Sequence, residues 1–333
     1  MKNEGIKGGE VSNTAEKASD EESQYETGNE LLGITLKVAS VGFLVSMSAM
    51  IKLVGDGIPV GQIVFFRAFF AILPVVVYLG YRGQLGQAYY TKRPLAHLGR
   101  SIVGCFGMGL GFYGLTKLPL PDVVALRHAT PLFAVIFAAI LLGERVRLYR
   151  WAAVAMGMCG VLIISWPRIT LFDSVGNVDE YHGVIATILS TIFAAVATIF
   201  VRALVKTEKS PTIVIYFSSM ASFFAAMTYF FGWVPLDLYN ATLLVSCGII
   251  GGIGQILMTE CYRHASVSVI APFDYTSILF GIVLSYILFG DLPQSQMLIG
   301  TAIVAAAGIF IIFREHRLGL PRKESRRQTG SQT

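Results

Sequence analysis

The sequence predicts an all-α membrane protein whose ten transmembrane helices form two inverted five-helix repeats. Hydrophobic residues make up 54% of the chain and charged residues only 14%, whereas soluble domains carry about 25% charged residues. After residue 30 the chain divides into ten apolar segments, each close to the ~20 residues that cross a bilayer. Gly143-Glu144 ends the fourth segment and Gly290-Asp291 ends the ninth, at an offset of 147 residues. These observations together predict a duplicated membrane fold.

The ten predicted spans follow one another through mostly short connections, so consecutive helices are expected to be antiparallel neighbours. Several spans begin at proline, which is favoured in the first turn of a helix. In chain order the predicted spans are Leu31–Val54, Pro59–Gly80, Pro94–Thr116, Pro121–Leu142, Leu148–Trp166, His182–Val201, Pro211–Trp233, Tyr239–Tyr262, Ser266–Phe289 and Gln294–Phe313.

The offset of 147 residues also brings Gly104 onto Gly251 and Gly107 onto Gly254. Because each half has an odd number of spans, the second half must enter the bilayer with the opposite orientation. Inverted repeats of this kind place a binding site near the membrane midplane in transporters. The predicted organisation is a disordered cytoplasmic tail at 1–30, a first repeat at 31–166, an outer linker at 167–181, a second repeat at 182–313 and a basic cytoplasmic tail at 314–333.

The distribution of Lys and Arg predicts the orientation of the chain in the membrane. The loops after spans two, four, six and eight, together with the carboxy-terminal tail, hold 16 of these residues, while the loops on the other side hold only Lys117 and Arg168. Positive residues are enriched on the cytoplasmic side. We therefore expect a multi-pass protein of the cell (inner) membrane with both termini in the cytoplasm.

Two stretches of the sequence resemble the drug/metabolite transporter superfamily of the EamA type. The first runs from Ala125 through Arg127, His128 and Pro131 to Gly143-Glu144, and the second from Ile270 through Pro272, Asp274 and Tyr275 to Gly290-Asp291. The resemblance covers residues 31–313, with Asp291 where a glutamate is common. It implies a secondary carrier of a small organic metabolite, since members of this family export or import amino acids, nucleosides, S-adenosylmethionine and riboflavin.

Ionisable residues inside spans are costly and are therefore candidates for function. Arg127 and Asp274 occupy equivalent positions in the two halves, and we predict that they line the pathway, either as a gate pair or in contact with the substrate; the alternative is a purely structural pair. Arg67 lies eight residues into span two, about 12 Å deep, where it either lines the pathway or braces a helix. Lys37 is expected to be a snorkelling anchor. Glu260 is expected to pair with Arg263 or Arg100.

Several aromatic side chains and one histidine lie near these charges. Tyr113, Tyr216 and Tyr275 could stack on a planar substrate, although such residues more often pack against neighbouring helices or face lipid. His128 adjoins Arg127 and could titrate during transport, with a polar packing role as the alternative. The histidines show no metal-ligand spacing, and no cofactor is predicted.

The predicted function is secondary transport by alternating access, with riboflavin uptake as the first hypothesis. Amino-acid or S-adenosylmethionine transport, including export, is the alternative within the same fold. The chain has no Walker sequence. An integral-membrane enzyme is the alternative from another class, but the sequence offers no catalytic residues, such as a nucleophile–base set. The expected partners are a small-molecule substrate and the lipid bilayer, without nucleic acid, and a homodimer is left open.

Overall fold

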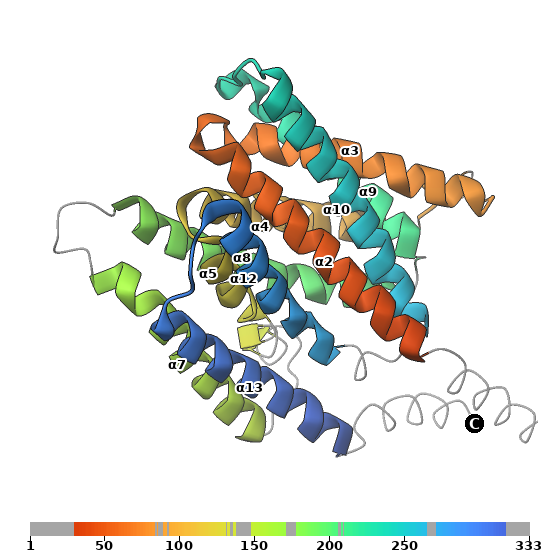
Figure 1. The fold of residues 1–333 in the computed structure, drawn as a ribbon. Helices are drawn as coiled ribbons and strands as arrows, with labels where there is room; N and C mark the ends of the chain where they lie inside the picture. The colour runs from red at the N-terminus through yellow and green to blue at the C-terminus, as the bar shows by residue number, and fades with distance from the viewer. Residues whose placement is uncertain are drawn as a thin grey trace, which may run out of the picture.

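The computed structural model describes residues 30–317, except for 84, 86–88, 92, 131, 134–135, 138–147, 171–177, 206–207, 209 and 265–270. Within this part the chain forms ten α-helices (Figure 1). The first half contributes α2 (Glu30–Val54), α3 (Val60–Tyr81), α4 (Pro94–Lys117), α5 (Leu120–Arg127) and α7 (Leu148–Thr170). The second half contributes α8 (Val178–Val205), α9 (Ser210–Ala226), α10 (Leu238–His264), α12 (Thr276–Phe289) and α13 (Ser295–Arg317).

The helices confirm the predicted all-helical membrane fold with its two repeats. Five helices are long and apolar enough to cross a membrane by themselves, and shorter apolar helices cover Trp151–Ile164, Phe273–Phe289 and Ser295–Phe310. In the predicted seventh span, a short 3-10 helix at Met227–Phe231 continues α9. Helices α7 and α8 both extend into the stretch expected as an outer linker.

Span nine is not one continuous helix. A 3-10 helix at Ala271–Tyr275 precedes α12, which ends at Gly290. The φ of Gly290 is +70°, a conformation that glycine adopts readily and that commonly ends a helix. In span four, α5 ends at Arg127. The equivalent Gly143-Glu144 and Pro131 lie outside the described residues.

The packing of the helices follows the internal repeat. The first helix of each half packs against the third helix of the other, so α2 contacts α10 and α8 contacts α4. Each contact includes the same kind of hydrogen bond: Ser40 Oγ donates to the Gly254 carbonyl at 2.8 Å, and Ser190 Oγ donates to the Gly107 carbonyl at 2.6 Å. Since the two accepting glycines are related by the sequence offset, the repeat is visible in the contacts themselves.

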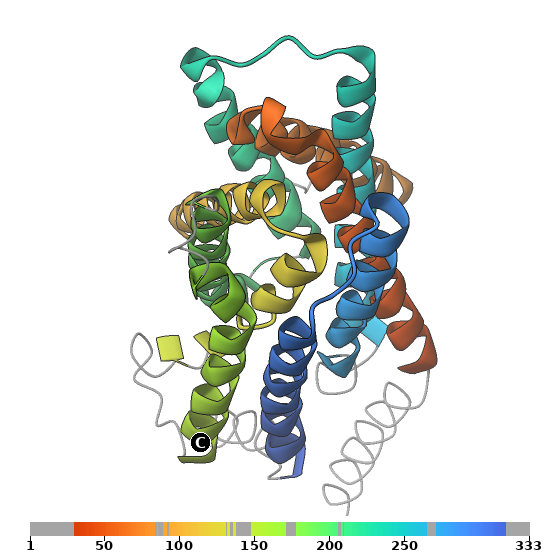
Figure 2. The same cartoon turned by 60° about the vertical axis from the view of Figure 1, so that its left-hand side comes forward.

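The last helices of the two halves also pack on each other. Figures 1 and 2 show α7 beside α13. A Cβ on Gly300 would lie 2.6 Å from the Gly160 carbonyl oxygen, so glycine permits this close approach. The contacts between α2 and α10, α4 and α8, and α7 and α13 intertwine the two sequence halves. If the molecule rocks during transport, the parts that move must therefore be packed groups of helices, and each group contains helices of both sequence halves.

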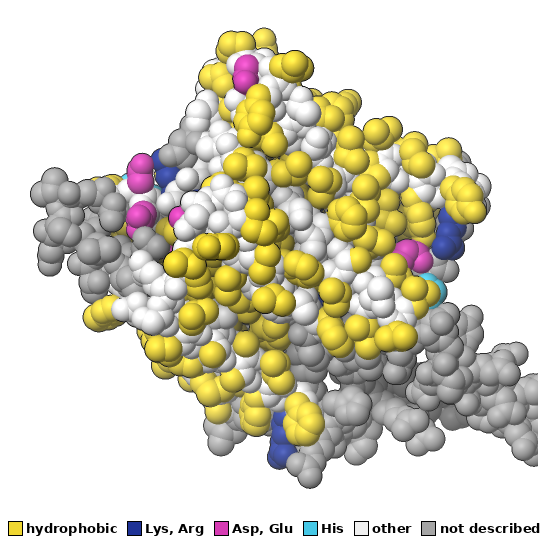
Figure 3. All heavy atoms as spheres, viewed as in Figure 1, with side chains coloured by type: hydrophobic (Ala, Val, Ile, Leu, Met, Phe, Trp, Pro, Cys, Tyr) yellow, Lys and Arg dark blue, Asp and Glu magenta, His cyan; other side chains and the backbone are white. Residues whose placement is uncertain are grey.

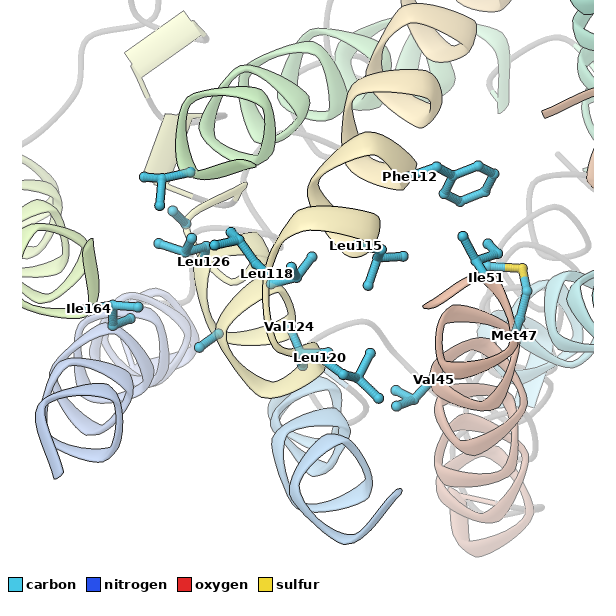
Figure 4. Close-up of a cluster of buried hydrophobic side chains, with 14 of the residues drawn as sticks. Val45, Met47, Ile51, Phe112, Leu115, Leu118, Leu120, Val124, Leu126 and Ile164 are labelled. Carbon is cyan, nitrogen blue, oxygen red and sulfur yellow. The ribbon is translucent and has the colours of Figure 1, made fainter. Parts of the chain in front are cut away.

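The interior is filled with aliphatic side chains. Figure 4 shows residues of α2, α4 and α5 converging, with Ile164 of α7 beside them. The labelled side chains include Met47, Ile51, Leu115 and Leu120, all buried. The outer surface is largely apolar too, and in Figure 3 hydrophobic side chains cover most of the visible face, with the charged groups near its edges. Such a surface suits contact with lipid.

Candidate functional site

The ends of two broken spans meet at a stacked pair of rings. The His128 ring, just after α5, lies 4.8 Å from the Tyr275 ring at an interplanar angle of 27°. His128 Nε2 and Ser277 Oγ are 2.8 Å apart, and Ser277 Oγ donates to the Asp274 carbonyl at 2.7 Å. His128 and Tyr275 are separated by the same 147 residues that relate the two halves. The stacked pair therefore lies where the pseudo-symmetry axis relates one half to the other.

Asp274, beside this pair, forms an ion pair with the first helix. Lys37 Nζ of α2 lies 2.7 Å from Asp274 Oδ1 and 3.1 Å from Met258 Sδ of α10. The Lys37 side chain is only 1% exposed, whereas Asp274 is 44% exposed. The expectation that Lys37 is a snorkelling anchor is wrong, because its ammonium group is buried between helices of both halves.

Arg127 does not form the expected ion pair with Asp274 in this structure, where Asp274 pairs with Lys37. The Arg127 side chain is exposed, and among the described residues it has no carboxylate partner. A gate that pairs Arg127 with Asp274 is thus a prediction for another conformation of the pathway.

Glu260 also differs from expectation. It lies 3.7 Å from Arg82 and accepts a hydrogen bond from the Tyr78 hydroxyl, so Arg100 is not its partner, and the Arg263 side chain lies outside the described part.

Arg67 and Arg100 extend the set of cations toward α3 and α4. Arg67 is buried at 4% exposure, and its Nε has no hydrogen-bond partner among the described residues. Sequence reasoning treated Arg100 only as a partner of Glu260 and missed its place here. The signal was available, because Arg100 lies six residues inside an apolar span, as far from the end of its span as Arg127.

The remaining predicted residues occupy two places. Tyr216 of α9 stacks on His97 of α4, with ring centroids 4.5 Å apart, and donates a hydrogen bond to the Tyr89 carbonyl at 2.7 Å. Tyr113 lies half-buried in α4, and no ring contact is found for it among the described residues. The structure therefore brings together His128, Asp274 and Tyr275, with Arg127 next to His128 in the chain. Tyr216 lies near Arg100, because its chain neighbour Phe217 packs on the Arg100 guanidinium.

Comparison with known proteins gives a consistent result. The model of the EamA-like transporter family matches residues 31–166 and 182–314. The pseudopaline exporter CntI of Pseudomonas aeruginosa is 29% identical over 283 residues, which is 83% of this chain and 94% of that protein.

Two further relatives are named for other substrates. The S-adenosylmethionine uptake transporter of Rickettsia prowazekii is 27% identical over 83% of this chain and 90% of its own. The riboflavin transporter of Rhizobium johnstonii is 26% identical over 75% and 79%. A solved structure at 16% identity has the same fold, with a TM-score of 0.58 over 85% of this chain and 98% of its own.

Proposed function

The chain belongs to the EamA-like transporter family, and from this premise we propose that it is a secondary carrier that moves a small organic metabolite across the membrane by alternating access. The protein is a multi-pass membrane transporter and not an enzyme. The observation that carries the mechanism is the contact between the two broken spans, where His128 stacks on its own repeat equivalent, Tyr275. Residues near a pseudo-symmetry axis are common to the inward-facing and outward-facing states of an inverted repeat.

We propose that the Lys37–Asp274 pair closes one end of the pathway. It joins α2 to the break in span nine, and by the predicted topology both residues lie near the cytoplasmic side. An ion pair between a buried ammonium and a half-exposed carboxylate can open when the carboxylate gains water or another cation. Arg127 is the second cation available to Asp274 in this proposal. Opening of the Lys37–Asp274 pair would expose the site to the cytoplasm.

The substrate hypotheses are those for which family members are named. Riboflavin remains the first to test because a riboflavin transporter is among the relatives. S-adenosylmethionine is the second compound to test, because an S-adenosylmethionine uptake transporter is also among the relatives. Amino acids are the third class to test. The orientation of both termini toward the cytoplasm belongs to the same proposal, as does the use of a gradient or exchange as the energy source.

The test is uptake by proteoliposomes that contain the purified protein, measured with radiolabelled riboflavin, S-adenosylmethionine and a mixture of amino acids. We expect saturable uptake of at least one compound without ATP, and loss of that uptake in Asp274→Asn. A riboflavin auxotroph that lacks other importers gives an independent growth assay. If confirmed membrane expression fails to rescue growth at low riboflavin, the flavin hypothesis is wrong and amino acids become the first candidates.

A further inference from the structure

Three arginines on three successive helices form a cation cluster, in which guanidinium atoms of Arg67 and Arg100 are buried and the Arg127 side chain is exposed. Arg67 lies on α3, Arg100 on α4 and Arg127 at the end of α5. Arg67 is close enough to each of the other two to interact with it electrostatically. Nε of Arg67 and both Nε and Nη1 of Arg100 are buried without a hydrogen-bond partner. None of the three guanidinium groups pairs with a carboxylate in the described part of the chain.

The groups that surround the cluster leave its charge uncompensated. Cys247 of α10, which interacts electrostatically with Arg67, is a buried free cysteine and supplies no carboxylate. On α4, the Arg100 guanidinium lies over the Phe217 ring, 4.1 Å from its centroid. A cation–π contact of this kind holds the guanidinium plane in position but does not neutralise it. The net charge of the cluster is therefore positive.

Glycines of both repeats provide space for these guanidinium groups. A Cβ on Gly251 of α10 would lie 3.6 Å from Arg67 Nε, and a Cβ on Gly104 of α4 would overlap the Arg100 guanidinium. Gly104 and Gly251 are related by the repeat offset. The same position in each half thus faces one arginine of the cluster, Gly104 on the same helix as Arg100 and Gly251 on a helix of the second half.

Unpaired buried charges lower stability, because desolvation of each ion costs several kcal/mol unless a partner compensates it. Guanidinium groups bind carboxylates and phosphates through parallel hydrogen bonds. We infer that the arginine cluster binds a carboxylate or phosphate group of the transported molecule. This inference rests on the proposed transport function and defines the substrate as an anion or a zwitterion with an exposed acid group.

The first test needs no substrate. The variants Arg67→Met and Arg100→Met retain much of the apolar stem and remove an unpaired charge. We expect each to raise the melting temperature of the purified, ligand-free protein by roughly 2 °C. This shift corresponds to about 1 kcal/mol of stability regained when the unpaired charge is no longer buried. Arg82→Met is the matched control, because it removes the partner of Glu260 and should lower the melting temperature. If Arg67→Met and Arg100→Met both lower it by as much as the control, the arginines brace helices and the inference is overturned.

The second test uses matched pairs of compounds that differ in the acid group. Flavin mononucleotide is compared with riboflavin, and glutamate with glutamine, by the thermal shift that each produces in the wild-type protein and by inhibition of tracer uptake. We expect the acidic member of at least one pair to stabilise the protein more than its neutral partner. We also expect Arg67→Met to reduce that stabilisation at least tenfold in apparent affinity, with Arg82→Met unchanged.

The two matched pairs also separate the sources of the acid group, because one carries a phosphate and the other a carboxylate. Equal shifts from acidic and neutral members, or shifts that Arg67→Met retains in full, would overturn the inference. If the anion site is overturned in this way but the protein transports a neutral compound, the proposed transport function still holds. Failure of uptake by every compound, together with an anion shift that depends on Arg67, would instead count against transport and support the anion site.

Discussion

Neutralising Asp274 tests the Lys37–Asp274 ion pair, which we propose closes one end of the pathway. In Asp274→Asn the Lys37 side chain, which is 1% exposed, loses the charge of Asp274. Coulomb's law for the 2.7 Å separation gives about 6 kcal/mol at an effective dielectric constant of ~20. This is an upper bound, because the carboxylate is 44% exposed and solvent screens it. Loss of one partner of a buried pair typically costs about 3–5 kcal/mol, so we expect about 2–3 kcal/mol here.

The assay is a double-mutant cycle on the thermal unfolding of the purified protein. Lys37→Met and Asp274→Asn should each lower the stability, and the double variant should recover part of the loss, because no lone charge then remains buried. We expect a coupling free energy of at least ~1.5 kcal/mol for this pair, well above the ~0.5 kcal/mol within which independent sites add. The control cycle combines Arg127→Met with Asp274→Asn and should be additive.

An additive cycle for Lys37 with Asp274 would show that these two residues are not coupled as an ion pair. A coupling that appears only for Arg127 with Asp274 would also contradict this ion pair, and would restore the sequence-based gate pair as the resting interaction.

The same residues can also be tested for transport, separately from their effect on stability. If Arg127 becomes the partner of Asp274 in the opposite conformation, a charge swap of these two residues should recover part of the transport that either single neutralisation loses.

Three further predictions address packing, the stacked rings and topology. Gly300→Leu should lower stability by about 1–3 kcal/mol through overpacking, because its Cβ would approach the Gly160 carbonyl; an unchanged melting temperature would contradict the close contact. Tyr275→Ala should slow transport through lost ring contact worth about 0.5–1.5 kcal/mol, whereas Tyr275→Phe should retain most of the rate, and equal losses would favour a role for the hydroxyl. Cysteines introduced at 55–58 should react with an impermeant reagent from outside the cell, and labelling of 203–210 instead would reverse the predicted orientation.

Much of the fold could be predicted because the bilayer limits what a chain can do. Every backbone polar group in the hydrocarbon must be satisfied within its own segment, so apolar segments of ~20 residues become helices. The repeat offset identified Gly107 and Gly254, which accept equivalent hydrogen bonds in the structure. The same offset relates His128 to Tyr275, whose rings stack, although among the predicted site residues only Arg127 and Asp274 were related in this way from the sequence.

The ion pairs could not be predicted in the same way. A sequence offset shows which residues are equivalent, but equivalent residues need not touch each other. Lys37 has no charged equivalent in the second half, and it reaches Asp274 only because α2 packs against helices of that half. Glu260 pairs with Arg82 for a similar reason, since α10 packs against α3. Such partners depend on tertiary packing, which short loops and hydropathy do not specify.

The central claim is that this chain carries a metabolite through the membrane without ATP, and tracer counterflow tests it most directly. Proteoliposomes are loaded with one unlabelled compound of the panel and diluted into its labelled form at low concentration. We expect a transient, saturable accumulation of label for at least one compound, and its loss in the Asp274→Asn variant. Accumulation no greater than in empty vesicles for every compound, from protein that still unfolds cooperatively, would contradict it.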